Sequence, residues 1–326
     1  MEMKYRLWAC LLFLPMVLWA SGRPKVAVVL SGGGAKGTAH IGALKVIEEA
    51  GIPIDYVVGT SMGAIVGGLY SIGYTPQQLD SMVNAQNWKF LLSDAPNPKD
   101  VLLDDRLKSE RYVLSIPFSL KSAAVSDAGI IKGKNLARLF STLTEGYQDS
   151  VDFSRLPIPF ACVSENLVNG SEVVFHEGIL ATSMRSSMSI PGVFAPVDLD
   201  GMVLVDGGMV NNYPVDVALA MGADYIIGVD VQSPLLKASE LKSVKDIFGQ
   251  IINLQGEKKY RENLRNTDVL IKVDVTGYSA ASFTKEAIDT LMVRGERAAM
   301  DSWDGLLALK RMENNGLSVS CSLSED

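Results

Sequence analysis

Histidine and cysteine are scarce in this sequence, and their scarcity limits the chemistry available to it. The 326 residues include two histidines, His40 and His176, and three cysteines. None of them has the spacing of a metal-binding motif, so we expect no metal site. An exported protein could join Cys162 to Cys321, but no feature of the sequence brings the two together, and we expect two free thiols.

Aromatic residues and basic charge are also in short supply. Aromatics make up 7% of a chain that is 48% hydrophobic, so the core must be mostly aliphatic, as in α/β proteins with buried parallel strands. Acidic residues outnumber basic ones by 37 to 30, which gives a net charge of -7 and a pI of about 5.1. This balance excludes the broad positive surface of a nucleic-acid-binding protein and gives no bulk attraction to anionic lipid.

The first 22 residues have the plan of a secretory signal peptide. Lys4 and Arg6 precede an apolar run over residues 7–20, and small residues follow it. The run contains Pro15 and is shorter than the roughly 18 apolar residues that a membrane-spanning helix needs. We therefore expect export, to the periplasm or outer membrane in a Gram-negative cell, with an uncleaved N-terminal anchor as the alternative.

Strands and helices alternate after this segment. Residues 25–30 and 55–59 have the β-branched, apolar character of buried strands, and residues 38–50 and 62–72 have helical periodicity. Glycine-rich turns join each strand to its helix. This order predicts a parallel sheet with helices on both faces, and right-handed crossovers place both turns at its carboxyl edge.

Residues 86–135 interrupt the alternation, because they are turn-rich and contain short apolar pieces. We expect hairpins or a lid over the sheet edge there. The elements expected beyond it are helices over 135–143, 182–188 and 214–221, strands over 158–163, 172–176, 202–205 and 225–230, and a charged, solvated helix over 257–265.

The second glycine turn contains a candidate nucleophile. Gly59, Ser61 and Gly63 fit G-x-S-x-G between a predicted strand and a predicted helix. In such a turn the serine is held up at the sheet edge, and the small flanking residues allow the strand and helix to approach closely. The alternative is a serine that caps an ordinary helix.

The first glycine turn allows two interpretations. Gly32, Gly34 and Gly37 fit G-x-G-x-x-G, which binds a pyrophosphate in dinucleotide-binding folds, but Asp55 begins the second strand instead of ending it. A phosphate-binding P-loop is excluded because Thr38 stands where that motif has lysine. In the second interpretation the turn is an oxyanion hole. Its backbone N–H groups, at a helix N-terminus, would face the charge that forms on an ester oxygen. This second interpretation explains why a serine turn follows.

A serine nucleophile needs a base, and the third glycine turn supplies a candidate. Asp206 ends a predicted strand and precedes Gly207 and Gly208, so its carboxylate is expected at the same sheet edge. The alternative is an ordinary Asp-Gly turn. His40 lies within the first helix and His176 at a strand end, and neither has the context of a catalytic base.

The motifs SGGGAKG, GTSMG and DGG, each at a strand end, resemble those of the patatin-like phospholipase family. The similarity includes the block MRSSMSIPGVFAPV and covers most of residues 24–300. It implies a three-layer α/β/α fold with a mostly parallel central sheet, and a Ser-Asp dyad without histidine that hydrolyses lipid acyl esters through an acyl-enzyme. The residues that it assigns are Ser61 as nucleophile, Asp206 as base, and the N–H groups of Gly32, Gly33, Gly34 and Met62 as the oxyanion hole.

The resemblance also bears on the rest of the chain. Lys36 stands where the family has a basic residue and is a candidate contact for a lipid phosphate, or else a structural or solvated lysine. We interpret Arg185 and Pro191 as structural. The signal peptide is similar to that of exported bacterial members, and the implied partners are a lipid or phospholipid substrate and, transiently, a membrane surface, with no cofactor and no nucleic acid. We expect one domain over residues 23–300, then a helix and tail over 301–326; the alternative function is a non-catalytic lipid- or partner-binding module.

Overall fold

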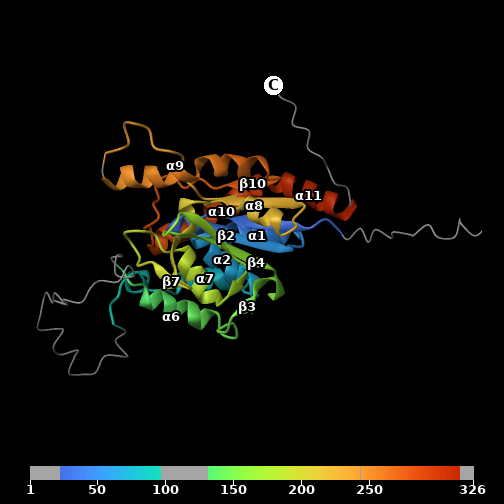
Figure 1. Ribbon diagram of the computed structural model, residues 1–326. Helices are drawn as coiled ribbons and strands as arrows, with labels where there is room; N and C mark the ends of the chain where they lie inside the picture. The colour runs from blue at the N-terminus through green and yellow to red at the C-terminus, as the bar shows by residue number, and fades with distance from the viewer. Residues whose placement is uncertain (1–22, 97–130, 243, 316–326) are drawn as a thin grey trace, which may run out of the picture.

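A computed structural model describes residues 23–96, 131–242 and 244–315 (Figure 1). The predicted signal peptide, Cys321 and most of the interrupting segment lie outside these residues. The strands are β1 (Val26–Leu30), β2 (Tyr56–Thr60), β3 (Val151–Asp152), β4 (Phe160–Asn166), β5 (Ser171–Phe175), β6 (Glu177–Gly178), β7 (Val197–Leu199), β8 (Met202–Asp206), β9 (Tyr225–Asp230) and β10 (Val269–Lys272).

The helices lie between and after these strands. The α-helices are α1 (Ala39–Ala50), α2 (Met62–Ser71), α3 (Pro76–Asn84), α4 (Trp88–Leu91), α6 (Lys134–Leu143), α7 (Leu180–Ser187), α8 (Val215–Ala220), α9 (Val244–Arg265), α10 (Lys285–Asp301) and α11 (Trp303–Asn315). Short 3-10 helices are η1 (Gly34–Thr38), η3 (Phe153–Arg155) and η4 (Gly207–Met209). Local signals set several of these bounds: Gly51 ends α1 in the left-handed conformation, and Thr75 and Gln78 form a capping box at the start of α3.

The central sheet is mostly parallel, as predicted. Its strand order is β10-β9-β1-β2-β4-β8-β7, and β5 also pairs with β4. The strands from β10 to β4 are parallel to their neighbours, whereas β8, β7 and β5 are antiparallel to theirs. β3 and β6 form a separate two-stranded ribbon.

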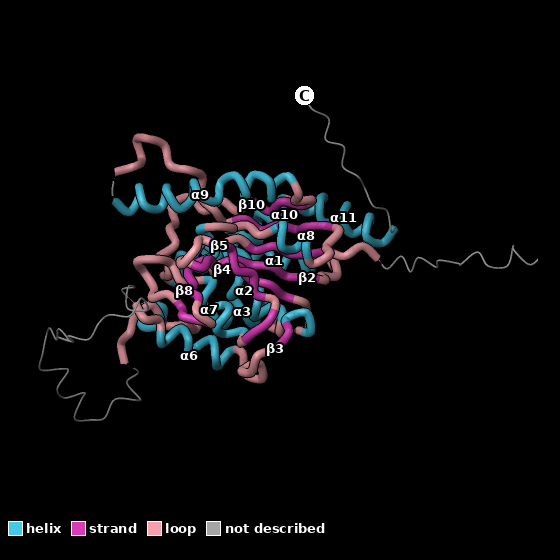
Figure 2. Tube along the Cα trace, viewed as in Figure 1, coloured by secondary structure: helices cyan, strands magenta, loops and turns pink. Residues whose placement is uncertain are grey.

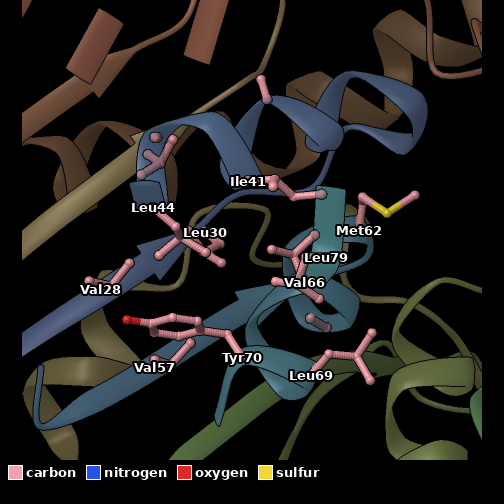
Figure 3. Close-up of a cluster of buried hydrophobic side chains, with 14 of the residues drawn as sticks. Val28, Leu30, Ile41, Leu44, Val57, Met62, Val66, Leu69, Tyr70 and Leu79 are labelled. Carbon is pink, nitrogen blue, oxygen red and sulfur yellow. The ribbon is translucent and has the colours of Figure 1, made fainter. Parts of the chain in front are cut away.

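Helices cover both faces of the sheet and make a three-layer α/β/α fold (Figure 2). Alternate residues of each central strand point to opposite faces, so Val28 packs beneath α1 and α2 while Val29 packs beneath α8 and α9. Figure 3 shows part of the first layer, in which side chains of α1, α2 and α3 lie over Val28 and Val57. Strand β1 is fully buried, which explains its continuous run of aliphatic residues.

An antiparallel strand brings Asp206 to Ser61. Val163 of β4 pairs with Thr60 at the end of β2, and the next β4 residue, Ser164, pairs with Asp206 at the end of β8. β5 occupies the other edge of β4 at these residues, so β2 and β8 must follow one another along a single edge. They run toward each other, so their carboxyl ends meet. The third turn thus reaches the predicted edge, but from the direction opposite to that of a parallel strand.

The expected elements occur within three residues of their predicted ends, with two corrections. Residues 88–91, inside the segment expected to form hairpins or a lid, form helix α4. The charged stretch 257–265 is the last part of α9 and is not simply solvated, because Asn263 is buried and Lys259 is half-buried. Its polar groups therefore face the protein as well as the solvent.

Candidate active site

Ser61 lies in a strained turn between β2 and α2. Its backbone has φ 55° and ψ -120°, in a region that non-glycine residues rarely adopt. A methyl group on Gly59 would lie 2.3 Å from the carbonyl oxygen of Gly63, and one on Gly63 would lie 2.1 Å from that of Leu30. Both flanking positions must therefore be glycine for the turn to keep its shape.

The side chains of Ser61 and Asp206 are hydrogen-bonded. Ser61 Oγ donates to Asp206 Oδ2 at 2.7 Å, and the N–H of Gly208 donates to Asp206 Oδ1 at 2.8 Å. Ser61 is 4% exposed and Asp206 is 6% exposed, so water has little access to either. This burial, offset in part by the two hydrogen bonds, raises the pKa of Asp206 to about 6. The carboxylate is a stronger base than an exposed aspartate and already accepts the hydrogen bond of the serine hydroxyl.

The first glycine turn lies against this pair, and one of its predicted donors is already used. The N–H of Gly32 donates to the carbonyl oxygen of Asn212 at 3.1 Å, so we correct its assignment to the oxyanion hole. For Gly33, Gly34 and Met62, no acceptor of the backbone N–H lies among the described residues. These three groups remain as candidate donors at the N-termini of η1 and α2.

The two histidines lie apart from the pair, as expected. His40 is fully buried in α1, and its Nε2–H donates to the carbonyl oxygen of Ser31 at 2.7 Å. Burial lowers the pKa of His40 to about 4, so the ring is neutral at physiological pH. His176 is exposed next to Phe175, which pairs with Cys162 near the start of β4, away from the edge that carries Ser61.

Two serines that hold the backbone of Ser61 and Asp206 were not predicted from the sequence. Ser187 Oγ accepts a hydrogen bond from the N–H of Ser61 at 2.8 Å and donates to the carbonyl oxygen of Val163 at 2.6 Å. The carbonyl oxygen of Ser189 accepts the N–H of Asp206 at 3.0 Å. Both serines belong to the MRSSMSIPG block, which was the available signal.

Arg185 is buried and contacts other residues of this block. Its guanidinium donates to Ser189 Oγ at 2.5 Å and to the carbonyl oxygen of Ala195 at 3.2 Å, and it lies over the ring of Phe194. These contacts are structural, in line with the interpretation from sequence. Pro191 follows in the turn that carries the chain from α7 to β7.

Comparisons with known proteins identify the family of the chain. The family described as patatin-like phospholipase matches residues 28–219, more than half of the chain. The chain belongs to this family. An uncharacterized NTE family protein of Mycobacterium tuberculosis is 32% identical over 211 residues, which are 65% of this chain and 50% of the relative. Lysophospholipase NTE1 of Mycosarcoma maydis is 27% identical over 306 residues, which are 86% of this chain and 15% of the relative.

The likeness to solved structures concerns the fold. Human GIVD cytosolic phospholipase A2 has a TM-score of 0.51 and 13% sequence identity, and the match covers 90% of this chain and 61% of that one. The family membership and the fold class predicted from the motifs are thus confirmed. The chain spans about half the length of the mycobacterial relatives that it matches.

An apolar cavity begins beside Ser61. It has a volume of about 50 Å³ and is lined by α1, α2, α3, α4 and α6, with Met62, Met82 and Met188 among the lining residues. Met62 directly follows Ser61, so the cavity starts at the turn itself. Methionine side chains change shape easily and can widen such a cavity for an inserted chain.

No helix in residues 23–96, 131–242 or 244–315 is both long and apolar enough to cross a membrane. The same residues contain no group of three or more His, Cys, Asp or Glu that could hold a metal ion.

Proposed function

We propose that this protein hydrolyses lipid acyl esters, with Ser61 as nucleophile and Asp206 as base. The observation that carries the proposal is the 2.7 Å hydrogen bond from Ser61 Oγ to a buried carboxylate, on a turn strained into the nucleophile conformation. The family of the chain and the lysophospholipase among its relatives support the same class of reaction.

The proposed reaction has two steps. Asp206 takes the proton of Ser61 as the oxygen attacks the ester carbonyl, and the proton then passes to the leaving alcohol. The acyl group stays on Ser61 until Asp206 activates a water molecule that releases it as a fatty acid. In each step the negative carbonyl oxygen is held by the N–H groups of Gly33, Gly34 and Met62. One such donor typically contributes roughly 10²-fold to 10³-fold in rate.

The surroundings of the pair support a lipid as the substrate. The apolar cavity that begins at Met62 would admit the start of the acyl chain, and its methionine side chains would have to move for the rest of the chain to enter. Meeting such a substrate requires transient contact with a membrane surface. We also propose export through the N-terminal segment, from the sequence of residues 1–22.

A serine-directed fluorophosphonate tests the nucleophile. We expect labelling of the wild type, loss of labelling in Ser61→Ala, and unchanged labelling in Ser81→Ala, which removes an exposed serine hydroxyl on α3. Hydrolysis of a lysophospholipid should fall by roughly 10³-fold or more in both Ser61→Ala and Asp206→Asn.

The same measurements separate the proposal from a non-catalytic binding module. Such a module would bind the lipid but release no fatty acid. Labelling that persists in Ser61→Ala would refute the nucleophile. Turnover of Asp206→Asn at the wild-type rate would refute the base.

A further inference from the structure

Ser164 of β4 lies where the two strands that carry the proposed pair meet. It pairs with Asp206 in the antiparallel ladder of β4 and β8. Its neighbour Val163 pairs with Thr60, the residue before Ser61. Residues directly opposite each other in an antiparallel ladder point to the same face of the sheet. The side chain of Ser164 therefore lies on the face that carries the Asp206 carboxylate.

The ladder holds the side chains of Ser164 and Asp206 close together. The N–H of Asp206 donates to the carbonyl oxygen of Ser189 at 3.0 Å, so it points away from β4, and the pair is of the non-hydrogen-bonded kind. In such a pair the Cα atoms lie about 4.5 Å apart and the side chains are closer than in the other kind. Rotation about χ1 moves a serine hydroxyl among three staggered positions. The Ser164 hydroxyl can thus turn to the carboxylate without movement of the backbone.

The hydroxyl of Ser164 is a buried donor that the resting structure does not use. The side chain is fully buried, and its Oγ has no hydrogen-bond partner among the described residues. Buried hydroxyls are mostly hydrogen-bonded, because an unpaired one loses its hydration without a replacement. Both carboxylate oxygens of Asp206 already accept a bond, Oδ2 from Ser61 and Oδ1 from Gly208. A spare donor therefore lies beside the proposed base.

The proposed reaction removes one of the two donors to Asp206. When Ser61 is acylated, its Oγ becomes an ester oxygen, which has no proton to donate. The leaving alcohol carries the proton away, so Asp206 is again an ionised, buried carboxylate, now with the N–H of Gly208 as its donor. Loss of a donor favours the neutral carboxyl group. A neutral Asp206 cannot take the proton of the water that releases the acyl group.

We propose that Ser164 is a positioning residue, which donates its hydroxyl to Asp206 Oδ2 in the acyl-enzyme, in place of the lost Ser61 hydroxyl. The inference rests on the proposed function and deepens it, because it assigns a residue to the second step alone. No covalent bond changes at Ser164. Its hydroxyl turns toward the carboxylate when Ser61 is acylated and away again when the free serine returns. The effect is to keep Asp206 ionised and oriented while water attacks.

Charged groups on the neighbouring elements do not replace this donor. Helix α2 has no charged residue, and the Arg185 guanidinium of α7 is bonded within its own block, as described above. Glu165 of β4 pairs across the ladder with Glu172 of β5. Both point to the opposite face of the sheet, because Glu165 directly follows Ser164.

Lys36, the lysine considered in the sequence as a phosphate contact, is also directed away from the pair. Its Nζ donates to Ser233 Oγ at 3.0 Å, in the segment that follows β9. Burial lowers the pKa of Lys36 to about 8, and the charges that act on it are those of Asp230 and Lys272. Asp206 therefore depends on neutral donors for the stability of its charge.

Burst kinetics with a p-nitrophenyl ester separate the two steps. Acylation releases the nitrophenol at once, and deacylation then sets the steady rate. We expect Ser164→Ala to keep the burst rate within about 2-fold of the wild type and to lower the steady rate by roughly 10-fold at pH 7. The acid limb of the steady rate should move to higher pH by about 1, while that of the burst rate stays at its wild-type midpoint.

Two further variants separate the hydroxyl from its packing. Ser164→Cys fills nearly the same space with a much weaker donor, so its steady rate should stay low. Ser71→Ala removes another fully buried hydroxyl without a partner among the described residues, at the far end of α2, and should change neither rate. A wild-type steady rate in Ser164→Ala would overturn the inference, as would equal losses in the burst and steady rates.

Urea unfolding gives an independent check. Because Ser164 Oγ has no partner among the described residues, its removal leaves none of them unpaired. The urea midpoint of Ser164→Ala should therefore be no lower than that of the wild type. A clearly lower midpoint would show that the hydroxyl is already bonded in the resting enzyme and would overturn the inference.

A titration keeps the inference testable without turnover. Carboxyl ¹³C NMR of aspartate-labelled protein measures the pKa of Asp206, with Asp206→Asn to assign the signal, and Ser61→Ala removes the donor that acylation would remove. In the Ser61→Ala background we expect Ser164→Ala to raise this pKa by about 1, and with Ser61 intact to leave it unchanged. Equal changes in both backgrounds would overturn the inference. A wild type with neither a burst nor Ser61-dependent turnover would overturn only the proposed function.

Discussion

Asp206 combines two properties that usually exclude each other, because it is a buried carboxylate and yet must carry charge to act as the base that we propose. Its hydrogen bonds from Ser61 and Gly208 favour the ionised form, while the loss of hydration favours the neutral one and is the larger effect. The resulting pKa of about 6 lies close to physiological pH, where a general base is most effective.

The titration of Asp206 should therefore set the acid limb of the activity. We expect kcat/KM for a short soluble ester to rise with pH around a midpoint of about 6, because only ionised Asp206 can take the serine proton. The measurement is a pH profile from 4 to 9 on enzyme shown to be folded throughout.

Histidine is the other side chain that titrates in this range, so its variants are the controls. His176→Ala, at an exposed position, should leave the profile unchanged. A limb that disappears in His176→Ala would contradict the assignment to Asp206.

Some residues of the site could be predicted from sequence because their signals are local. Ser61 and Asp206 each lie beside glycines within a few residues, and those glycines are required by contacts inside the same turn. The use of the Gly32 N–H depends instead on Asn212, and the support of the Ser61 N–H depends on Ser187, 126 residues further along the chain. Contacts of this kind leave no pattern in the nearby sequence.

At the scale of elements, α9 is the helix whose role differs most from the expectation. Its charged end packs against the chain that follows η4 and leads to α8. Asn263 is 2% exposed, and its Nδ2 donates to the carbonyl oxygen of Tyr213 at 2.7 Å and to Asp216 Oδ1 at 3.0 Å. Lys259 pairs with Glu172 and Asp216. A run of charged residues usually predicts a solvent-exposed helix face. Here part of that face supplies the polar partners of the buried segment between η4 and α8.

Removing Asn263 should disturb the turn that begins at Asp206. We expect Asn263→Ala to lower the free energy of unfolding by about 3 kcal/mol, because several buried donors and acceptors lose their partner. The activity per folded molecule should also fall, since the displaced turn carries Gly208 and with it the carboxylate of Asp206.

Urea unfolding and active-site titration measure the two effects separately. Glu262→Ala is the matched control on the same helix, because this side chain is 56% exposed, and it should change neither quantity appreciably. Full stability in Asn263→Ala would show that α9 does not hold the turn.

The sequence predicted the parallel part of the sheet but not the order of its antiparallel strands. The β1, β2 and β9 part was predictable because each strand is followed closely by a helix or a turn signal. The strands β5, β7 and β8 are short and antiparallel, and their order depends on pairing with β4. The carboxyl-edge rule placed Asp206 correctly, although β8 reaches that edge by running the other way.

For the molecule as a whole, two buried titratable groups act in opposite directions on stability. The native pKa of Asp206 is raised from 3.8 to about 6, so its contribution to stability is present below pH 4 and is lost as the pH rises through 6. The native pKa of His40 is lowered from 6.5 to about 4, so its contribution is present above pH 6.5 and is lost as the pH falls through 4. Each shift corresponds to about 3 kcal/mol.

Between pH 4 and pH 7 the two contributions should largely cancel in the wild type, and single variants should separate them. Relative to the wild type, Asp206→Asn should gain about 3 kcal/mol in free energy of unfolding as the pH rises from 4 to 7, because it removes a buried charge. His40→Gln should gain a similar amount as the pH falls over the same range, and the double variant should show little pH dependence relative to the wild type. Urea unfolding at three pH values measures these differences, with Ser81→Ala as the flat control. Because each comparison subtracts the wild-type value, the contributions of all other carboxylates to the free energy of unfolding cancel. If the difference between Asp206→Asn and the wild type did not change with pH, the Asp206 carboxylate would have to titrate at the same pH in the folded and unfolded chain.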